Sequence, residues 1–430
     1  MSDEKVCIIG AGSSGIVAAK TLHENGVPFD VYERGSGIGG NWRFRNDNGM
    51  SAAYASLHIN TSKTRMAYSD YPMPEDYPDY PHHSQILEYF ENYVDHFGFR
   101  DKIRFKTTVD QCRPTEDGGW EVTLEGGETQ RYRGLMVANG HHWSPKSPDF
   151  PGEFHGRVRH SHEYETPEGL EGQRVLVVGI GNSGVDIACE SSRHAAKTFL
   201  STRRSAHILP KYAFGRPIDH FSSPAAGKLP LALQRLGYDV ILKVSRGPQE
   251  TFGVPEPDHH ILQAHPTISA DLLNLVGHGR IQMKPDLERL EGDRVRFADG
   301  SVETIDEIIY ATGYKVSFPF FESDVIDTSE NEVPLYRFVV HFDLPHLYFI
   351  GLVQPLGAIM PLAEAQSRWV AKLLTGECRL PDRPKMEKGY QNDREAMARR
   401  YVKSTRHTIQ VDFFPYLEQL DREVRQGSRR

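Results

Sequence analysis

The sequence has few cysteines and no paired-cysteine motif. Its four cysteines, Cys7, Cys112, Cys189 and Cys378, are far apart among 430 residues. Without a CxxC or a longer paired motif, the sequence indicates neither a dithiol redox centre nor a structural zinc site. Cys7 and Cys189 lie in apolar runs and are expected to be buried thiols. We therefore expect no metal ion, and a protein of the reducing cytoplasm.

Basic residues are not in excess, and long uninterrupted apolar runs are absent. Lys and Arg number 50 against 58 Asp and Glu, and the formal net charge of −8 provides no basic footprint for nucleic acid. At the N-terminus acidic residues precede a short apolar run, which is not the pattern of a secretory signal. The window HLYFIGLVQPLGAIMPLAEA is interrupted by Gln354, Pro355, Pro361 and Glu364, which favours strand, turn and helix over a membrane span. We expect neither a nucleic-acid partner nor a membrane partner.

A glycine-rich turn follows the first apolar run. The run KVCIIG ends at Gly10, and Gly12 and Gly15 complete the spacing GxGxxG. A helical pattern follows, and the next strand, FDVYE, ends at Glu33. In a dinucleotide-binding unit the glycines allow the tight turn, the approach of the pyrophosphate and the packing of the helix, while the acid accepts hydrogen bonds from a ribose diol. This segment predicts a site for a dinucleotide with a free 2′-hydroxyl.

The pattern recurs in RVLVVGIGNSGVDIACE, with Gly179, Gly181 and Gly184. The strand after it reads TFLSTRRS and ends in Arg203 and Arg204 in place of an acid. Arginine makes bidentate contacts with phosphate oxygens, as a 2′-phosphate requires, although the two arginines could also be a solvated surface pair. We predict that this turn binds NADP(H). One free-ribose site and one NADP site are typical of a flavoprotein that holds FAD and is reduced by NADPH.

The order of the patterns predicts an α/β fold with two Rossmann-like dinucleotide-binding domains, the NADP domain inserted into the FAD domain. We expect residues 1–150 to form the first part of the FAD domain, and residues 151–310 to form the NADP domain. Residues 311–430 would form the second part of the FAD domain with C-terminal helices. Alternating residues over 103–138 predict a β-meander within the first part. About residues 215–270 the pattern predicts no definite elements.

A further motif stands just ahead of the second glycine turn. In FHGRVRHSHEY, Phe154, Gly156, His160 and Tyr164 have the spacing FxGxxxHxxxY. This resembles the identifying signature of flavin-containing monooxygenases. The segments INTSKTRMAYSDYPMPEDYPDYP, YATGY and GLVQPLGAIMPLAEAQSRW are similar to other parts of that family, and the resemblance extends from residue 1 to about residue 380. A Baeyer–Villiger monooxygenase would be expected to have Trp, followed by Pro or Asp, where this sequence has Tyr164 and Glu165.

The resemblance implies an FAD-dependent NADPH monooxygenase of the N,N-dialkylamine or sulfide type. NADPH would reduce FAD, and O₂ would add at flavin C4a to form a hydroperoxide that bound NADP⁺ stabilises. The distal oxygen would pass to a soft nitrogen or sulfur of a small molecule, giving an N-oxide or an S-oxide. Baeyer–Villiger ketone oxygenation and a non-catalytic NADP-binding redox sensor are the alternatives. We also expect a homodimer.

The resemblance also assigns site residues. Asn60 matches the family's asparagine beside the isoalloxazine and is the expected catalytic residue, since its amide both donates and accepts, although a plain turn residue is the alternative. His160 is expected to order the segment around NADP, and not to bind a metal ion with His155 and His162. The expected FAD-binding residues are Gly10, Gly12, Ser14, Gly15, Glu33, Gly40, Trp42, Asn60, Thr61, Val109 and Gln354. The expected NADP-binding residues are Gly179, Gly181, Asn182, Ser183, Gly184, Ser201, Arg203 and Arg204.

Tyrosines alternate with prolines in the segment that follows Asn60. These are Tyr68, Tyr71, Tyr77 and Tyr80. They could form an aromatic wall for a hydrophobic amine or sulfide. They could equally hold a proline-rich loop in place by packing, and the sequence leaves both interpretations open.

Overall fold

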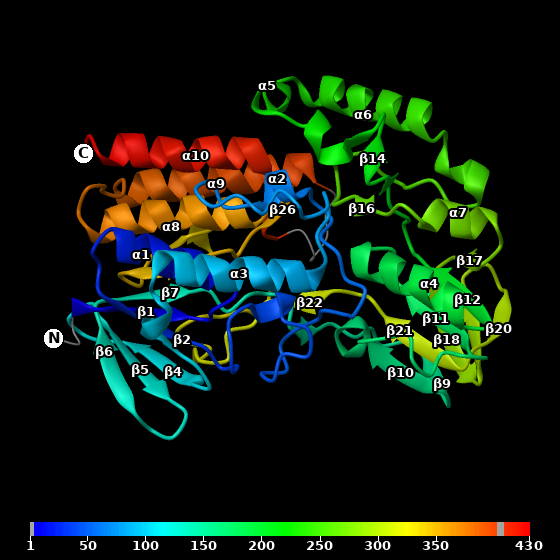
Figure 1. Ribbon diagram of the computed structural model, residues 1–430, viewed down its shortest axis with the longest axis horizontal. Coiled ribbons are helices and arrows are strands. Elements are labelled where there is room, and N and C mark those ends of the chain that lie inside the picture. Colours follow the sequence, from blue (N-terminus) through cyan, green and yellow to red (C-terminus); the bar gives the residue numbers. More distant parts are fainter. Residues whose placement is uncertain (1–3, 402–407) are drawn as a thin grey trace. The chain divides into compact units, whose positions relative to one another are not determined.

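The computed structural model describes residues 4–401 and 408–430 and divides the chain into two compact units. Unit 1 comprises Met1–Ala53, Leu57–Ser144 and Lys315–Arg430, and unit 2 comprises Tyr54–Ser56 and Pro145–Tyr314. In Figure 1 the chain passes from the blue and cyan elements of unit 1 to the green and yellow elements of unit 2, and returns to the orange and red helices of unit 1. Unit 2 is therefore an insertion within unit 1.

The centre of unit 1 is a seven-stranded sheet in the order β23-β24-β25-β7-β1-β2-β3. Strand β1 is parallel to β2 and β7, so that Val6 lies opposite both Phe29 and Gly134. All four residues of β1 are buried, which explains why its sequence is continuously apolar and not alternating. The strands are β1 (Val6–Ile9), β2 (Phe29–Tyr32), β3 (Ile103–Arg104), β7 (Gly134–Val137), β23 (Leu335–Tyr336), β24 (Val340–His341) and β25 (Leu347–Phe349).

Helices pack around this sheet, and unit 1 also contains a separate three-stranded antiparallel sheet. Helix α1 contacts both α3 and α8, and α8 contacts α10. The small sheet, in the order β4-β5-β6, is the meander that the alternating pattern predicts. None of the helices in the described part of the chain has the length and apolarity needed to span a bilayer. The elements are α1 (Ser13–Glu24), α2 (Lys63–Met66), α3 (His83–Phe97), β4 (Val109–Pro114), β5 (Trp120–Leu124), β6 (Thr129–Tyr132), β26 (Gln354–Leu356), α8 (Met360–Leu374), α9 (Arg383–Arg400), β27 (Gln410–Asp412) and α10 (Phe413–Gly427).

Unit 2 has its own five-stranded parallel sheet, in the order β10-β21-β11-β12-β17. Helix α4 follows β11 as α1 follows β1, so the strand–turn–helix–strand unit occurs twice. These sheets confirm the predicted α/β fold with two Rossmann-like units. The elements are β9 (Gly152–Phe154), β10 (Arg157–His160), β11 (Arg174–Val178), α4 (Asn182–His194), β12 (Lys197–Ser201), α7 (Leu272–Gly277), β17 (Ile281–Lys284), β18 (Leu287–Gly292), β19 (Arg294–Phe297), β20 (Val302–Thr304) and β21 (Glu307–Tyr310).

The stretch without a definite sequence pattern contains one long helix, α6 (Leu231–Ser245). Its sequence LALQRLGYDVILKVS has apolar residues on all sides, so no amphipathic period marks it. Short elements surround it, and β13 pairs with β16 in parallel. They are β13 (Ile208–Leu209), β14 (Tyr212–Ala213), β15 (Arg216–Pro217), α5 (Pro224–Gly227) and β16 (Thr267–Ile268).

Candidate functional site

The first glycine turn joins β1 to α1 at the carboxyl end of the strand. Gly10 has a φ of +99°, and a Cβ there would lie 2.7 Å from the Ala138 carbonyl oxygen. A Cβ on Gly15 would lie only 1.9 Å from the Gly10 carbonyl oxygen. Gly12 precedes α1 without a side-chain cap, so the protein supplies no capping side chain for the first amide groups of α1. These groups suit the pyrophosphate of a dinucleotide.

A second glycine segment packs against the first turn. The Gly39 amide donates to the Ala11 carbonyl oxygen at 3.0 Å. A Cβ on Gly40 would lie 3.0 Å from Cα of Gly12, so two backbones meet where side chains would separate them. The short 3-10 helix Gly40–Trp42 starts at this contact, and Trp42 packs against the core of unit 1. Two of the expected FAD residues, Gly40 and Trp42, therefore lie beside the turn.

Glu33 stands directly after β2 and is 4% exposed. Its Oε2 accepts a hydrogen bond from the Ala11 amide at 2.8 Å. Its Oε1 accepts from the Gly35 amide at 2.7 Å and from the Asn48 side-chain amide at 3.1 Å. A carboxylate has about four acceptor positions, so one remains for a ribose hydroxyl. The Glu33 carboxylate is thus held at the turn by the backbone amides of Ala11 and Gly35.

Asn60 precedes the short helix α2 and is half-buried. Its side chain has no hydrogen-bond partner among the described residues, and neither does that of Thr61. Lys63 differs, because its Nζ donates to the carbonyl oxygens of Pro74 and Glu75 at 3.1 and 2.7 Å. Lys63 therefore holds the following loop, whereas the Asn60 amide is not used by any contact within the described chain.

The four tyrosines after Asn60 belong to the packed interior of unit 1. Tyr68 is 2% exposed, and its hydroxyl donates to the Ser13 carbonyl oxygen at 2.6 Å. Tyr77 and Tyr80 are buried in the same core, and Tyr71 packs against it. Of the two interpretations that the sequence leaves open, the structure supports packing. Through Tyr68, the loop is tied to the first residue of α1.

The expected residues Ser14, Val109 and Gln354 come from three other segments of unit 1. Gly351, at a φ of +78°, lies against Ser14, since a Cβ on it would be 2.1 Å from the serine Oγ. The chain just ahead of Gln354 therefore contacts the first turn of α1. Gln354 is half-buried at the start of β26, and Val109 is buried at the start of β4.

The second glycine turn repeats the geometry of the first. Gly179 has a φ of +116°, and a Cβ there would lie 2.4 Å from the Ala311 carbonyl oxygen. A Cβ on Gly184 would lie 2.0 Å from the Gly179 carbonyl oxygen. Gly181 precedes α4 and, like Gly12, offers no side-chain cap. Ser183 is exposed in the first turn of this helix.

The ribose end of the second turn has no acid, and its two arginines differ. Arg204 donates to Asp258 through Nε at 2.7 Å. Arg203 is exposed and makes no hydrogen bond or ion pair with the described residues. Ser201 is fully buried and donates to the Pro285 carbonyl oxygen at 2.6 Å. Of the two guanidiniums, that of Arg203 has no partner in the described chain, while Ser201 stabilises the strand end.

Asn182, expected to bind NADP, has a role inside unit 2. Its Oδ1 accepts a hydrogen bond from the Ile268 amide at 2.8 Å. The neighbouring Thr267 hydroxyl donates to the Ile180 carbonyl oxygen at 2.6 Å. Strand β16 is therefore fastened to the glycine turn, and one acceptor position of the Asn182 side chain is used for this purpose.

The four signature residues build the segment that enters unit 2. Phe154 packs against a core cluster, and a Cβ on Gly156 would lie 2.4 Å from the Asp306 carbonyl oxygen. His160 Nδ1 accepts from the His162 amide at 3.1 Å and caps the 3-10 helix Ser161–Glu163. Burial lowers the pKa of His160, which favours the neutral ring that can accept this bond.

Tyr164 is fully buried, and its hydroxyl donates to Glu190 Oε2 on α4 at 2.6 Å. The guanidinium of Arg159 lies over its ring, 4.9 Å from the centroid. Tyr164 therefore connects the signature segment to the dinucleotide helix of unit 2.

Tyr54 is a residue that sequence reasoning missed. It is buried in unit 2, where its hydroxyl donates to Asp186 Oδ2 on α4 at 2.5 Å. The next amide, that of Ala55, donates to the Glu165 carbonyl oxygen at 2.8 Å. The chain then continues within six residues to Asn60. The available signal was the pair Asp186 and Glu190, spaced i,i+4 on a helix that should have an apolar inner face.

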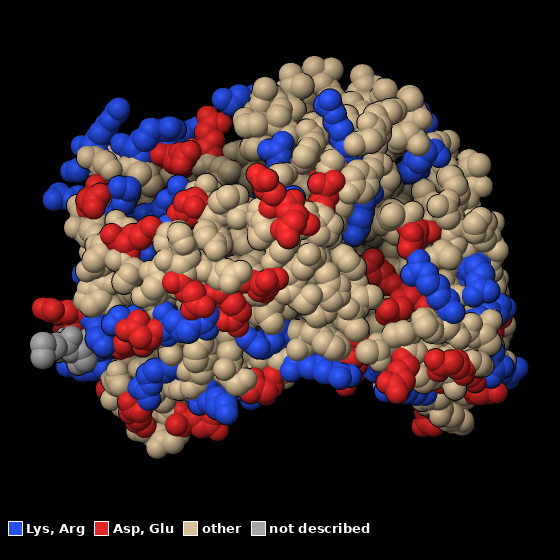
Figure 2. All heavy atoms as spheres, viewed as in Figure 1, with Lys and Arg blue, Asp and Glu red and all other residues tan. Residues whose placement is uncertain are grey.

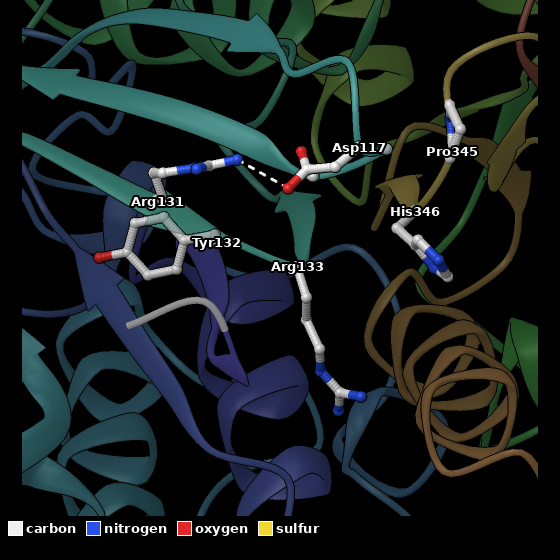
Figure 3. A pocket seen from close by; sticks show the side chains of 8 residues that line it. Asp117, Arg131, Tyr132, Arg133, Pro345 and His346 are labelled. Atoms are coloured by element: carbon white, nitrogen blue, oxygen red, sulfur yellow. Dashed lines mark hydrogen bonds and ion pairs between the residues drawn. The ribbon is translucent and has the colours of Figure 1, made fainter. Parts of the chain in front are cut away.

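A pocket of ≈ 420 Å³ lies at the end of the unit 1 sheet that is opposite to the first glycine turn (Figure 3). Arg133 and His346 line it, and they directly precede β7 and β25, so it lies at the amino ends of strands whose carboxyl ends face the glycine turn. Arg131 donates to Asp117 across its wall at 2.7 Å. None of the expected site residues lines this pocket, which is therefore separate from the candidate site.

Comparisons with known proteins agree with this geometry. Residues 3–427 match the family described as flavin-binding monooxygenase-like. The chain is 40% identical to flavin-containing monooxygenase 5 of Rattus norvegicus, over 98% of this chain and 82% of the relative. It is 37% identical, with the same coverage, to the N-oxide-forming dimethylaniline monooxygenase 2 of Rattus norvegicus.

Two solved structures share the fold. S-allyl-L-cysteine S-oxygenase from Allium sativum has a TM-score of 0.73 and 24% identity, covering 98% of this chain and 88% of that one. An oxidised steroid monooxygenase bound to NADP has a TM-score of 0.74 and 18% identity, covering 99% and 98%. At these identities the likeness shows the fold alone.

Proposed function

Because the chain belongs to the flavin-binding monooxygenase-like family and uses FAD and NADP(H), we propose that it oxygenates a soft nitrogen or sulfur atom of a small molecule. One atom of O₂ enters the product as an N-oxide or S-oxide, and the other leaves as water. NADPH and a proton are consumed, and NADP⁺ is formed. The 37% identical relative that is named for N-oxide formation supports this substrate class.

The contrast between the two glycine turns supports the cofactors on which the proposal depends. At the first, buried Glu33 can accept from a ribose diol, and its charge would repel a phosphate. At the second, exposed Arg203 can pair with a 2′-phosphate. Neither helix has a side-chain cap at its N-terminus, so both suit an anionic pyrophosphate. The residues thus fit FAD in unit 1 and NADP(H) in unit 2.

Bound FAD supplies the redox chemistry that joins NADPH, O₂ and the substrate. The protein is left to bind, orient and exclude water, and Asn60 is the residue proposed to contact the reacting groups. Its unpartnered amide can donate through Nδ2 and accept through Oδ1 at once. Asn60 is not an acid or a base, so its proposed role is to hold hydrogen-bonded groups in place.

The test is a comparison of substrates under one assay. Purified enzyme with NADPH and ¹⁸O₂ is given N,N-dimethylaniline, methyl phenyl sulfide or cyclohexanone, and NADPH loss, hydrogen peroxide and product mass are measured. We expect labelled N-oxide or S-oxide and little peroxide. A labelled lactone from cyclohexanone without N- or S-oxide would replace the proposal by ketone oxygenation. NADPH loss that no substrate alters would indicate a sensor.

Two further expectations belong to the same proposal. An Asn60→Ala variant should release more peroxide for each NADPH consumed, while its KM for NADPH changes little. A Thr64→Val variant, altered at an exposed residue of α2 that is not among the expected site residues, serves as the control. The homodimer and the cytoplasmic location stay predictions, which light scattering and cell fractionation would test.

A further inference from the structure

Arg133 is a half-buried cation that has no acidic partner in the described chain. On the face seen in Figure 2, basic and acidic side chains lie beside one another over much of the surface. The arginines of unit 1 that pair with carboxylates include Arg43, Arg100, Arg104, Arg113 and Arg131. A charge that is partly removed from water and has no counter-ion is unfavourable. An anion bound at Arg133 would therefore stabilise this charge.

The Arg133 guanidinium uses one nitrogen inside the protein and leaves one edge without an acceptor. Its Nη1 donates to the Leu374 carbonyl oxygen, at the last residue of α8, at 3.3 Å. Its Nε is buried and has no hydrogen-bond partner among the described residues, and Nη2 beside it has none either. Capping of α8 explains Nη1 alone. The remaining edge, Nε with Nη2, is the geometry that binds two oxygens of a carboxylate or a phosphate.

The pocket that Arg133 lines has room for more than a simple ion. Its volume of ≈ 420 Å³ lies within the range of about 300–1,000 Å³ that is usual for small-molecule sites. Figure 3 shows the Arg133 and His346 side chains extending to the same side of the strand ends. Desolvation and the nearby Arg133 charge both lower the pKa of His346, so the imidazole is neutral at neutral pH. Arg133 is therefore the charge that an anion would meet on this side.

Two hydrogen bonds fix the walls around this side chain. The Trp120 indole Nε1 donates to the Pro345 carbonyl oxygen at 3.0 Å and holds the segment ahead of β25. The Thr115 amide donates to the Gly119 carbonyl oxygen at 2.9 Å and closes the hairpin turn between β4 and β5. A Cβ on Gly118 would lie 3.9 Å from the side chain of Pro345, so the turn and the proline face each other. The pocket is therefore formed before a ligand enters.

Asp117 limits the charge of a ligand. Its Oδ2 accepts a hydrogen bond from Arg131 Nη2 at 2.7 Å, and both side chains are exposed, so this pair is neutral and weakly held. Two arginines and one carboxylate line the pocket, which gives a net charge of +1. Arg133 balances one anionic group, whereas a second group would meet the Asp117 carboxylate.

We propose that this pocket binds a small organic acid with a single anionic group. The carboxylate or phosphate of the ligand lies on the Nε–Nη2 edge of Arg133, and its uncharged body lies beside Pro345 and the hairpin turn. The site is at the opposite end of the unit 1 sheet from the first glycine turn and includes none of the expected cofactor residues. The proposal is therefore independent of the substrate class proposed above.

Isothermal titration calorimetry of the full-length protein with bound FAD tests this site. Benzoate and phenyl phosphate are the probes for the two anionic groups, and benzamide is the neutral control. NADP⁺ in excess keeps the anions away from the second glycine turn. We expect at least one anion to bind, and benzamide to bind at least about tenfold more weakly, because it lacks the charge that pairs with Arg133. The tighter anion shows whether the site prefers a carboxylate or a phosphate.

Matched variants identify the pocket. Arg133→Gln should weaken binding about 10- to 100-fold, because a charge-assisted bidentate contact is lost. Arg113→Gln is the control and should bind like the wild type, since Arg113 lies on β4, pairs with Glu322 and does not line the pocket. Asp117→Asn should strengthen binding, because it removes the repelling carboxylate and leaves the bond between Arg133 and Leu374 in place. Flavin absorbance and thermal unfolding report whether each variant folds.

Three results would overturn the proposal. The first is that neither anion binds at about 10 mM, and the second is that benzamide binds as well as the anions. The third is that a folded Arg133→Gln binds like the wild type, or that Arg113→Gln loses binding equally. If Arg133→Gln does not fold, Asp117→Asn decides, and an affinity no higher than that of the wild type for both anions would remove the assignment.

Discussion

In unit 1 the strand β1 is followed by Gly10, and in unit 2 the strand β11 is followed by Gly179. In each unit the next helix starts in close contact with the carbonyl oxygen of that glycine. A Cβ would come within 1.9 Å of this oxygen at Gly15 and within 2.0 Å at Gly184. The ribose ends differ, because a buried carboxylate closes one and an exposed guanidinium stands beside the other. The backbone of the turn is thus a common requirement, and the two turns differ in the side chains that follow the second strand.

The two helices also differ in how they are held. When Gly10 is aligned with Gly179, Val17 and Thr21 of α1 correspond to Asp186 and Glu190 of α4. Val17 is fully buried, and the Thr21 hydroxyl donates to its own helix at the Val17 carbonyl oxygen. The two α4 carboxylates instead accept phenol hydroxyls from elsewhere in unit 2. Helix α1 is held by apolar packing, and α4 by packing together with two polar contacts to phenol hydroxyls.

The largest effect on stability should come from adding a methyl group at Gly15 or Gly184, where the helix start lies closest to the preceding turn. Gly15→Ala and Gly184→Ala each force the helix away from its strand, which should cost about 3 kcal/mol of unfolding free energy. Gly12→Ala is the control, since its Cβ would meet nothing closer than 3.5 Å. It should fold normally and lose only FAD affinity. Thermal unfolding and flavin content distinguish the two; a stable, flavin-free Gly15→Ala would contradict the packing argument.

The next effect concerns the ribose end of the second turn. Arg203→Ala should raise the KM for NADPH by about 10- to 100-fold, the equivalent of one lost charge-assisted contact of about 1.5–3 kcal/mol, and leave the KM for NADH unchanged. Arg204→Ala should have a smaller effect, because Arg204 is already paired with Asp258. Steady-state kinetics with both nucleotides measure this. A larger effect from Arg204 would reverse the assignment.

Removal of the phenol contacts to α4 should have a moderate effect. Tyr164→Phe leaves Glu190 without its donor and should cost about 1–3 kcal/mol of unfolding free energy. Thr21→Val, at the corresponding position of α1, removes only a local bond and should cost less than about 1 kcal/mol. Urea unfolding of both variants gives the comparison. Equal losses would mean that the two helices are held in the same way.

These contrasts divide what the sequence could predict from what it could not. Both glycine turns could be predicted because the constraint is local: a positive φ at Gly10 and Gly179 and a close helix start need glycine at fixed spacing. The inequality of Arg203 and Arg204 depends on Asp258, more than fifty residues away, and no local pattern indicates it.

The sequence shows the two acids of α4 but not that Tyr54 is the partner of Asp186, because Tyr54 is 132 residues away. The sequence pattern did not predict helix α6 for a different reason. Its apolar residues occupy both faces, so the period that identifies a helix packed on one side is absent. The site residues themselves stay predictions until variants and bound cofactors are measured.

The last effect is one of pH, and it concerns Asp186 of α4. The pKa of Asp186 is raised from its ordinary value of 3.8 to about 6, and burial is the largest cause. The charges of Asp271 and Glu190 also raise this pKa, whereas the Tyr54 hydroxyl and Lys211 lower it. Between these two pH values the folded protein binds a proton that the unfolded chain has lost. The stabilisation from the protonated carboxyl is therefore complete below pH 3.8 and is lost as pH rises to about 6.

Asp186→Asn keeps an acceptor for the Tyr54 hydroxyl and removes this titration. The variant should gain stability relative to the wild type as pH rises through that window, on the order of 2 kcal/mol. Unfolding midpoints of both proteins at several pH values between 4 and 7 measure the difference, and Val17→Asn, at the corresponding position of α1, should show a pH-independent loss. If the Asp186→Asn difference does not change with pH, the carboxylate is solvated, and α4 is held by packing in the same way as α1.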